Sequence, residues 1–155
     1  MKPTINDVIV HLQRHYTERD ILLFEGASDE DINQLEETLR CRLPEDIKIF
    51  YRFTDGFIGR ADAFRIIPLR EINERRKVTF LFQQGNFDIA EFFLYQSLWT
   101  INRDIIDEDK YTIYNHDADM VHLTDSFAEF LEVFLKGGVY NGLGEWKQQI
   151  KSLRK

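Results

Sequence analysis

The stretch Gly26–Gly56, GASDEDINQLEETLRCRLPEDIKIFYRFTDG, decides the fold class of this chain. Ser28 stands just before a run with helical periodicity, where its hydroxyl can cap a helix, and Asp31 occupies the place of a capping-box acid. The apolar residues of that run recur at helical spacing: Ile32, Leu35, Leu39. The pattern therefore predicts a helix that begins after Ser28.

A second helix is predicted to begin at Pro44, whose missing N–H suits the first turn of a helix. Ile47, Phe50 and Tyr51 give this helix one apolar face. Asp55-Gly56 ends it in a turn, and Gly56 is a candidate for positive φ.

This segment resembles the signature of the SUKH superfamily. The residues that carry the resemblance are Gly26, Ile32, Leu35, Glu36, Leu39, Leu43-Pro44-Glu45-Asp46-Ile47, Phe50-Tyr51 and Asp55-Gly56. Two further segments match: Phe64-Arg65-Ile66-Ile67-Pro68-Leu69 resembles the first strand of the family, and Leu123–Leu131 resembles the entry to its C-terminal helix. The motif is specific for the fold and poorly specific for function, because family members do different jobs on one scaffold.

The resemblance implies an α+β fold and a role in protein binding. The superfamily includes yeast regulators of cell-wall assembly and many bacterial immunity proteins that neutralise polymorphic toxins. Yeast-type members carry long extra segments around the shared domain, whereas this chain is expected to be the bare domain, which favours an immunity protein.

The bulk properties predict one domain over residues 1–155. Apolar residues make up 43% of the chain and 13 residues are Phe, enough for one sizeable core. The single cysteine, Cys41, cannot form an internal disulfide, which favours a reducing cytoplasm. Asp7 and His11 interrupt the N-terminal apolar residues, so we expect no signal peptide. We expect no membrane span, because no run approaches the ~18 apolar residues that one needs.

Outside the signature, periodicity predicts a helix over about residues 4–16 and a run of strands in the middle of the chain. The predicted strands are Phe64–Leu69, Val78–Phe82, Glu91–Gln96, Leu98–Asn102, Tyr111–Asn115 and Met120–Leu123. Pro68 makes the first an edge strand or ends it. The last two form a hairpin whose turn is Asn115–Asp119. Helices at both ends of this run indicate an α+β domain with a mainly antiparallel sheet of five to six strands.

Two helices are predicted after the sheet. Ser126 and Glu129 form a capping box for the first, and Gly137-Gly138 stops it. The second carries Leu143, Trp146, Ile150 and Leu153 at steps of three and four residues. The predicted core is Leu35, Leu39, Leu43, Ile47, Phe50, Phe127, Phe130, Leu131 and Phe134.

Motifs for catalysis are absent from the sequence, which predicts a protein that is not an enzyme and needs no cofactor or metal. There is no GxxxxGK[ST], no GxGxxG after a strand and no GxSxG. Cys41 lies between Arg40 and Arg42, whose charge would favour a thiolate, but no base stands nearby, and a small residue at a helix–helix junction is the simpler interpretation. His11 and His15 share a helix face without the glutamate of HExxH.

One alternative from the enzyme class is a metal-assisted hydrolase that uses the turn His116–Asp119. His116, Asp117, Asp119 and His122 lie within seven residues of the predicted hairpin. Residues three apart in a strand point to opposite faces, so His122 is not expected to join the ligands of the turn. An ordinary Asn/Asp turn is the favoured interpretation.

The formal net charge of −7 disfavours a nucleic acid partner and favours a basic protein. Two acidic segments stand out, Ser28–Thr38 on a predicted helix and Asp104–Asp119 in predicted loops. We predict a cytoplasmic immunity protein that blocks a basic toxin domain such as a nuclease; the alternative is a regulatory interaction module of the cell-wall type. The predicted partner-binding residues are Asp104, Asp107, Glu108, Asp109, Asp117 and Asp119, with the helix face Asp29–Glu37 as the rival surface.

Overall fold

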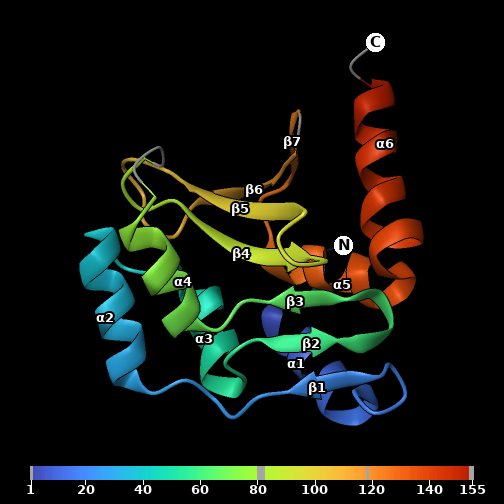
Figure 1. The fold of residues 1–155 in the computed structure, drawn as a ribbon, viewed down its shortest axis with the longest axis horizontal. Helices are drawn as coiled ribbons and strands as arrows, with labels where there is room; N and C mark the ends of the chain where they lie inside the picture. Colours follow the sequence, from blue (N-terminus) through green and yellow to red (C-terminus); the bar gives the residue numbers. More distant parts are fainter. Residues whose placement is uncertain (1, 80–82, 118, 154–155) are drawn as a thin grey trace.

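The computed structural model describes residues 2–79, 83–117 and 119–153. Seven strands form one antiparallel sheet in which spatial order follows chain order (Figure 1). The strands are β1 (Ile21–Leu23), β2 (Phe57–Gly59), β3 (Phe64–Ile66), β4 (Phe87–Phe92), β5 (Ser97–Arg103), β6 (Tyr111–His116) and β7 (Met120–Thr124). The α+β fold with an antiparallel sheet is confirmed, with seven strands where the sequence predicts five to six.

Helices lie against one face of this sheet and at its two ends. They are α1 (Ile5–His15), α2 (Asp29–Leu39), α3 (Glu45–Phe53), α4 (Leu69–Lys77), α5 (Phe127–Gly137) and α6 (Glu145–Leu153), with a 3₁₀ turn η1 (Arg60–Asp62) and a π-helical turn η2 (Gly138–Gly144). In Figure 1, α1, α3 and α5 lie behind the strands, α2 and α4 stand side by side at one end, and α6 stands at the other. The described helices include none with the length and apolar character needed to cross a membrane.

The signature segment folds as its local chemistry predicts. Ser28 caps α2 by accepting the Asp31 N–H at 3.1 Å, and Pro44 is the N-cap residue of α3. Gly56 has φ +82°, and a Cβ there would lie 2.2 Å from the carbonyl oxygen of Ile66. Only glycine fits this turn, because it has neither the side chain that would clash nor the strain of positive φ. The prediction for Gly56 is confirmed.

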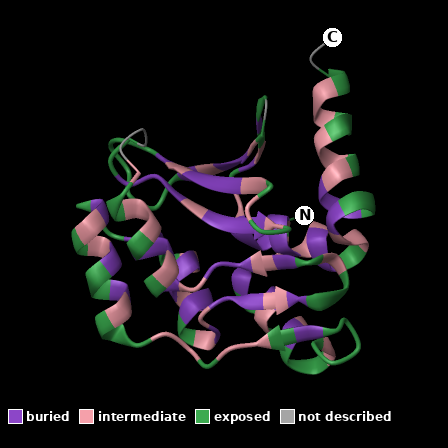
Figure 2. Cartoon of the chain, viewed as in Figure 1, coloured by how far each residue is buried: buried purple, intermediate pink, exposed green. Residues whose placement is uncertain are grey.

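The core lies between the sheet and α1, α3 and α5, where Figure 2 shows the buried residues concentrated. All nine predicted core residues are buried, the most exposed being Phe134 at 6%. Aromatic rings pack between the layers and within the helical layer: Phe64 of β3 stacks on Phe134 of α5 with ring centroids 4.1 Å apart, and Phe50 of α3 meets Phe127 of α5 edge-on at 5.1 Å. Such pairs add to the stabilisation that burial alone provides.

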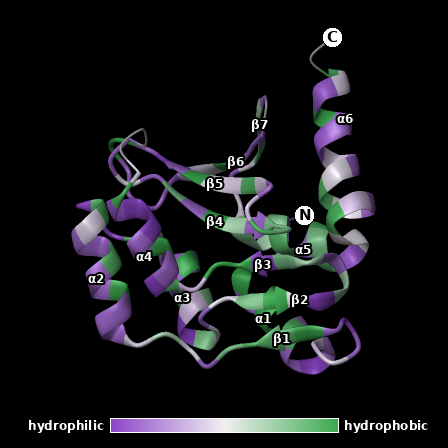
Figure 3. Cartoon of the chain, in the orientation of Figure 1, coloured by the Kyte–Doolittle hydropathy of each residue, from purple (hydrophilic) through white to green (hydrophobic). Residues whose placement is uncertain are grey.

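The middle of the chain differs from the sequence-based prediction. The strand predicted over Phe64–Leu69 ends at Ile66, because Pro68 is the N-cap residue of a helix, α4, that periodicity missed. Figure 3 colours α4 largely hydrophilic, and only Leu69, Ile72 and Asn73 of it are buried, which leaves too little apolar periodicity to recognise. Val78 is the C-cap residue of α4, and residues 80–82 of the predicted strand Val78–Phe82 lie outside the described residues.

The strand predicted over Glu91–Gln96 is wrong in its bounds. Strand β4 begins at Phe87 and ends at Phe92, and Phe93, Leu94 and Tyr95 all have positive φ, between 50° and 66°. This left-handed turn is held at its end by Glu91, whose carboxylate accepts the Tyr95 N–H at 2.5 Å and pairs with Arg65 at 2.8 Å. Glu91 is 3% exposed, so a buried carboxylate that is paired with Arg65 holds a backbone conformation that non-glycine residues rarely adopt.

The C-terminal helices begin and end close to their predicted positions. Ser126 caps α5 by accepting the Glu129 N–H at 3.1 Å, but the Glu129 carboxylate accepts the Thr124 hydroxyl in place of the Ser126 N–H. The Thr124 oxygen accepts that N–H at 3.1 Å, so a third residue completes the predicted capping box. In α6, no residue is fully buried and Leu153 is 86% exposed, because the helix extends past the edge of the sheet (Figures 1 and 2).

Candidate partner-binding surface

The loop that joins β5 to β6, residues 104–110, carries four of the six predicted partner-binding acids, and every residue in it is exposed. Its base is closed by a backbone hydrogen bond from Asp104 N–H to the Lys110 carbonyl at 2.9 Å. The Asp104 carboxylate accepts the N–H groups of Asp107 at 2.9 Å and Ile106 at 2.8 Å, and these bonds lower the pKa of Asp104. We call residues 104–110 the acidic loop.

Arg103, the last residue of β5, anchors the base of the acidic loop. Its guanidinium donates to the carbonyl oxygens of Glu108 and of Arg42, so it joins the loop to the segment between α2 and α3. Arg103 is 8% exposed, and sequence analysis missed it because an Arg at a strand end is ordinarily a surface residue.

Cys41 lies in the same α2–α3 junction, as predicted, half-buried, with its Sγ 3.6 Å from the Arg103 guanidinium. Burial raises the pKa of Cys41 despite the opposing effect of Arg103. Raising the pKa keeps the thiol protonated, so the cysteine is not activated as a nucleophile.

A second set of contacts ties the acidic loop to α3 and α5. Asp109 accepts the Glu45 N–H at the start of α3 at 3.2 Å. The Tyr111 hydroxyl donates to the Asp46 carboxylate and accepts the Phe127 N–H at 2.9 Å. Burial raises the pKa of both Asp46 and Tyr111. The loop is therefore attached to the helical layer as well as to the sheet.

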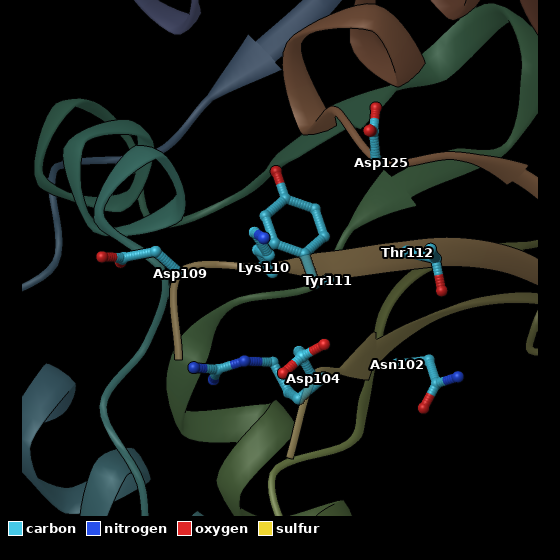
Figure 4. Close-up of a pocket in the computed structure, with 8 residues that line it drawn as sticks. Asn102, Asp104, Asp109, Lys110, Tyr111, Thr112 and Asp125 are labelled. Atoms are coloured by element: carbon cyan, nitrogen blue, oxygen red, sulfur yellow. The ribbon is translucent and has the colours of Figure 1, made fainter. Parts of the chain in front are cut away.

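A cavity of about 450 Å³ opens beside the acidic loop. Its lining is Asn102, Arg103, Asp104, Asp109, Lys110, Tyr111, Thr112 and Asp125. Figure 4 shows Asn102 and Asp104 on one side, Tyr111 and Thr112 on the other, and Asp125 at the far edge. Asp125 pairs with Lys2 at 2.6 Å, which lowers the pKa of Asp125, whereas Asp104 and Asp109 have no basic side chain within 4.0 Å in the described part of the chain.

The other two predicted acids, Asp117 and Asp119, lie at the opposite end of β6, about 25 Å from Asp109 along the strand. Lys147 of α6 contacts both carboxylates at 3.4 Å, and Lys151 contacts Asp119 at 2.7 Å. These lysines lower the pKa of Asp119, with Lys151 as the main cause. The structure thus separates the six predicted residues into two groups. The four in the acidic loop form no ion pair among the described residues, and Asp117 and Asp119 are paired with lysines.

The rival surface on α2 carries acids that are partly paired. Asp29 lies 3.7 Å from Arg52, Asp31 lies 3.9 Å from Arg70, and Glu36 lies 3.1 Å from the ammonium group of Lys48. Glu36 also accepts the Leu43 N–H at 2.7 Å. The negative charge on α2 is therefore compensated more than that of the acidic loop.

The histidines form no metal centre in the part of the chain that the structure describes. No group of three or more His, Cys, Asp or Glu side chains in that part could hold a metal ion. The His116 and His122 rings both lie near the Tyr114 ring, at 5.9 and 5.5 Å between centroids. Asp117 and Asp119 turn instead to the lysines of α6. The rings of His11 and His15 on α1 contact each other in a tilted arrangement, with centroids 4.8 Å apart.

Comparison with known proteins assigns the chain to a family. No curated protein matches it. The model of the SMI1 / KNR4 family (SUKH-1) matches residues 26–133, which include the signature segment, strands β2 to β7 and most of α5. The match covers well over half of the chain and ends within the helix that carries Phe130. The chain therefore belongs to the SMI1 / KNR4 family (SUKH-1).

Proposed function

We propose that this protein is a non-catalytic, cytoplasmic immunity protein that neutralises a cognate toxin domain by binding it. Membership of the SMI1 / KNR4 family supports a binding role, since immunity proteins and regulators share this scaffold. The observation that carries the proposal is the acidic loop. Its four carboxylates have no basic side chain within 4.0 Å among the described residues, whereas Asp117 and Asp119 are paired with lysines.

The free charge suits a basic partner such as the substrate cleft of a nuclease. A field of one sign steers the encounter and raises the association rate. Asp109 is attached to the start of α3, and Arg103 joins Glu108 of the loop to Arg42; these attachments restrain the loop, so less conformational freedom is lost on binding. The partner is excluded from its own substrate because the loop occupies the cleft.

Co-expression with the toxin domain encoded beside this chain's gene tests the proposal. The wild-type chain is expected to restore growth, and Asp107→Lys/Glu108→Lys is expected to weaken the rescue. Glu30→Lys/Glu37→Lys on α2 is the matched control, because it changes the charge equally on another exposed surface. Failure of the wild-type chain to rescue would reject the immunity role and favour the regulatory module.

A further inference from the structure

The tip of the acidic loop is apolar. Ile105 is 93% exposed and Ile106 is 94% exposed, the highest values among the large hydrophobic side chains that the structure describes. A single exposed apolar residue needs no explanation, but two adjacent isoleucines that are both almost fully exposed at one loop tip do. Folding gains nothing from these two side chains, since almost none of their surface is buried.

The backbone of the tip is fixed by its own loop. Asp104 accepts the N–H of Ile106, and Lys110 N–H donates to the Asp107 carbonyl at 3.1 Å. The two isoleucines are therefore displayed from a closed, hydrogen-bonded turn. Because Ile is β-branched, its χ1 angle is already restricted, and little rotamer freedom is lost when it is buried in an interface.

Negative charge surrounds this apolar tip. Asp104 precedes it, and Asp107, Glu108 and Asp109 follow it, all exposed. Resting on the immunity role proposed above, we propose that Ile105 and Ile106 are the anchor of the interface and enter an apolar depression on the toxin domain whose rim carries Lys and Arg side chains. The basic rim is inferred because it complements the acids of the loop, and the apolar depression is inferred because it would bury the two isoleucines.

The two parts of the tip have separate kinetic roles. The acids attract the basic rim at a distance and set the association rate. The isoleucines act only at contact. The charged residues around them then exclude water, as the residues around the hot spots of other interfaces do. Loss of the isoleucines therefore changes the dissociation rate, which is the rate that most interface substitutions alter.

The test is Ile105→Ser/Ile106→Ser, measured by biolayer interferometry against the toxin domain encoded beside this chain's gene. We expect the dissociation rate to rise at least roughly tenfold, as for a hot spot, with an association rate within about twofold. Leu94→Ser is the matched control: Leu94 is 83% exposed on the β4–β5 turn, away from the acidic loop. An unchanged dissociation rate in the double variant, or a larger effect of Leu94→Ser, would show that the two isoleucines do not anchor the interface.

A second probe separates failure of the anchor from failure of the immunity role. A phage-displayed library of short random disulfide-closed peptides is selected on the full wild-type chain. Enriched peptides that combine Lys or Arg with large apolar residues, and that lose binding to Ile105→Ser/Ile106→Ser, support the anchor whether or not the toxin domain binds. Peptides that bind both proteins equally, or no enrichment, count against it. If the toxin domain does not bind the wild-type chain but such peptides are enriched, the immunity role is rejected and the anchor is not.

Discussion

Phe130 stands at the centre of the aromatic core. It is fully buried, and its ring meets those of Phe64, Trp99 and Phe127 at centroid distances of 6.0 to 6.3 Å. Phe130→Ala is expected to lower the free energy of unfolding by about 3–5 kcal/mol, through lost burial and the cavity left behind. Phe93→Ala is the matched control, because Phe93 is 50% exposed. A loss below about 1 kcal/mol for Phe130→Ala in urea melts would contradict this role.

Gly56 is the second residue on which the signature depends. Gly56→Val places a branched side chain at φ +82° and forces its Cβ towards the Ile66 carbonyl, 2.2 Å away. The contact is with backbone, so β3 must shift to relieve it. We expect a loss of more than about 1 kcal/mol, beyond the ordinary gain from replacing glycine. Thermal melts measure this, and an unchanged midpoint would mean that the turn relaxes freely.

At the scale of elements, α6 is held to the β6–β7 hairpin by charge. Lys147 contacts Asp117, Asp119 and the Asn115 side chain, and Lys151 contacts Asp119. No residue of α6 is fully buried, so apolar packing contributes less here than it does for α5. The hairpin acids predicted to bind a partner thus have a structural role within the chain.

This attachment has a defined pH dependence. The pKa of Asp119 is lowered by Lys151 and Lys147 below its ordinary value of 3.8, so the ion pairs stabilise the docked helix above that value. Protonation of Asp119 removes the contribution as the pH falls through its lowered pKa. We expect amide exchange in α6 to accelerate below pH 3.8 relative to α5. Asp119→Asn should show fast α6 exchange at neutral pH also; exchange equal to that of wild type would show that the lysines do not hold the helix.

At the scale of the whole molecule, the formal net charge of −7 is unevenly compensated. Acids on α2 and on the hairpin form ion pairs with basic side chains, whereas the four acids of the acidic loop form none among the described residues, and Lys110 acts on Asp104 only at longer range. The acids of the loop therefore produce a local negative field at one end of the sheet, beside the cavity that Asp104 and Asp109 line together with Arg103 and Lys110. Such a field decides where a basic protein first makes contact.

Charge reversal measures this directly. Asp107→Lys/Glu108→Lys should slow association with the proposed toxin partner by roughly tenfold at low salt and flatten its dependence on ionic strength, since steering acts on the association rate. Folding should change little, because exposed charges contribute about 0–1 kcal/mol each. Glu30→Lys/Glu37→Lys should leave the rates nearly unaltered. The reverse ranking of the two double variants would move the surface to α2.

Local rules predicted much of the helical layer and little of the first half of the sheet. Ser28 and Ser126 mark helix starts by accepting N–H groups of their own neighbours, Pro44 marks one by its missing N–H, and these positions were correct. Strands β1 and β2 have three residues each, too short to show a period of two, and they exist because they pair with each other. The turn at Phe93–Tyr95 was missed because Glu91 and Arg65, not glycine, stabilise its positive φ.

For the candidate surface, the sequence determined which residues carry charge, and the tertiary structure decided which of them are free. Asp109 and Asp117 are both acids in predicted loops, and nothing near either residue in the sequence distinguishes them. Lys147, 30 residues after Asp117, neutralises one and not the other. The exposure of Ile105 and Ile106 is likewise a tertiary fact, because periodicity describes the face of an element and a loop has none. Capping and periodicity act between near neighbours, whereas ion pairing and burial depend on what the rest of the fold brings close.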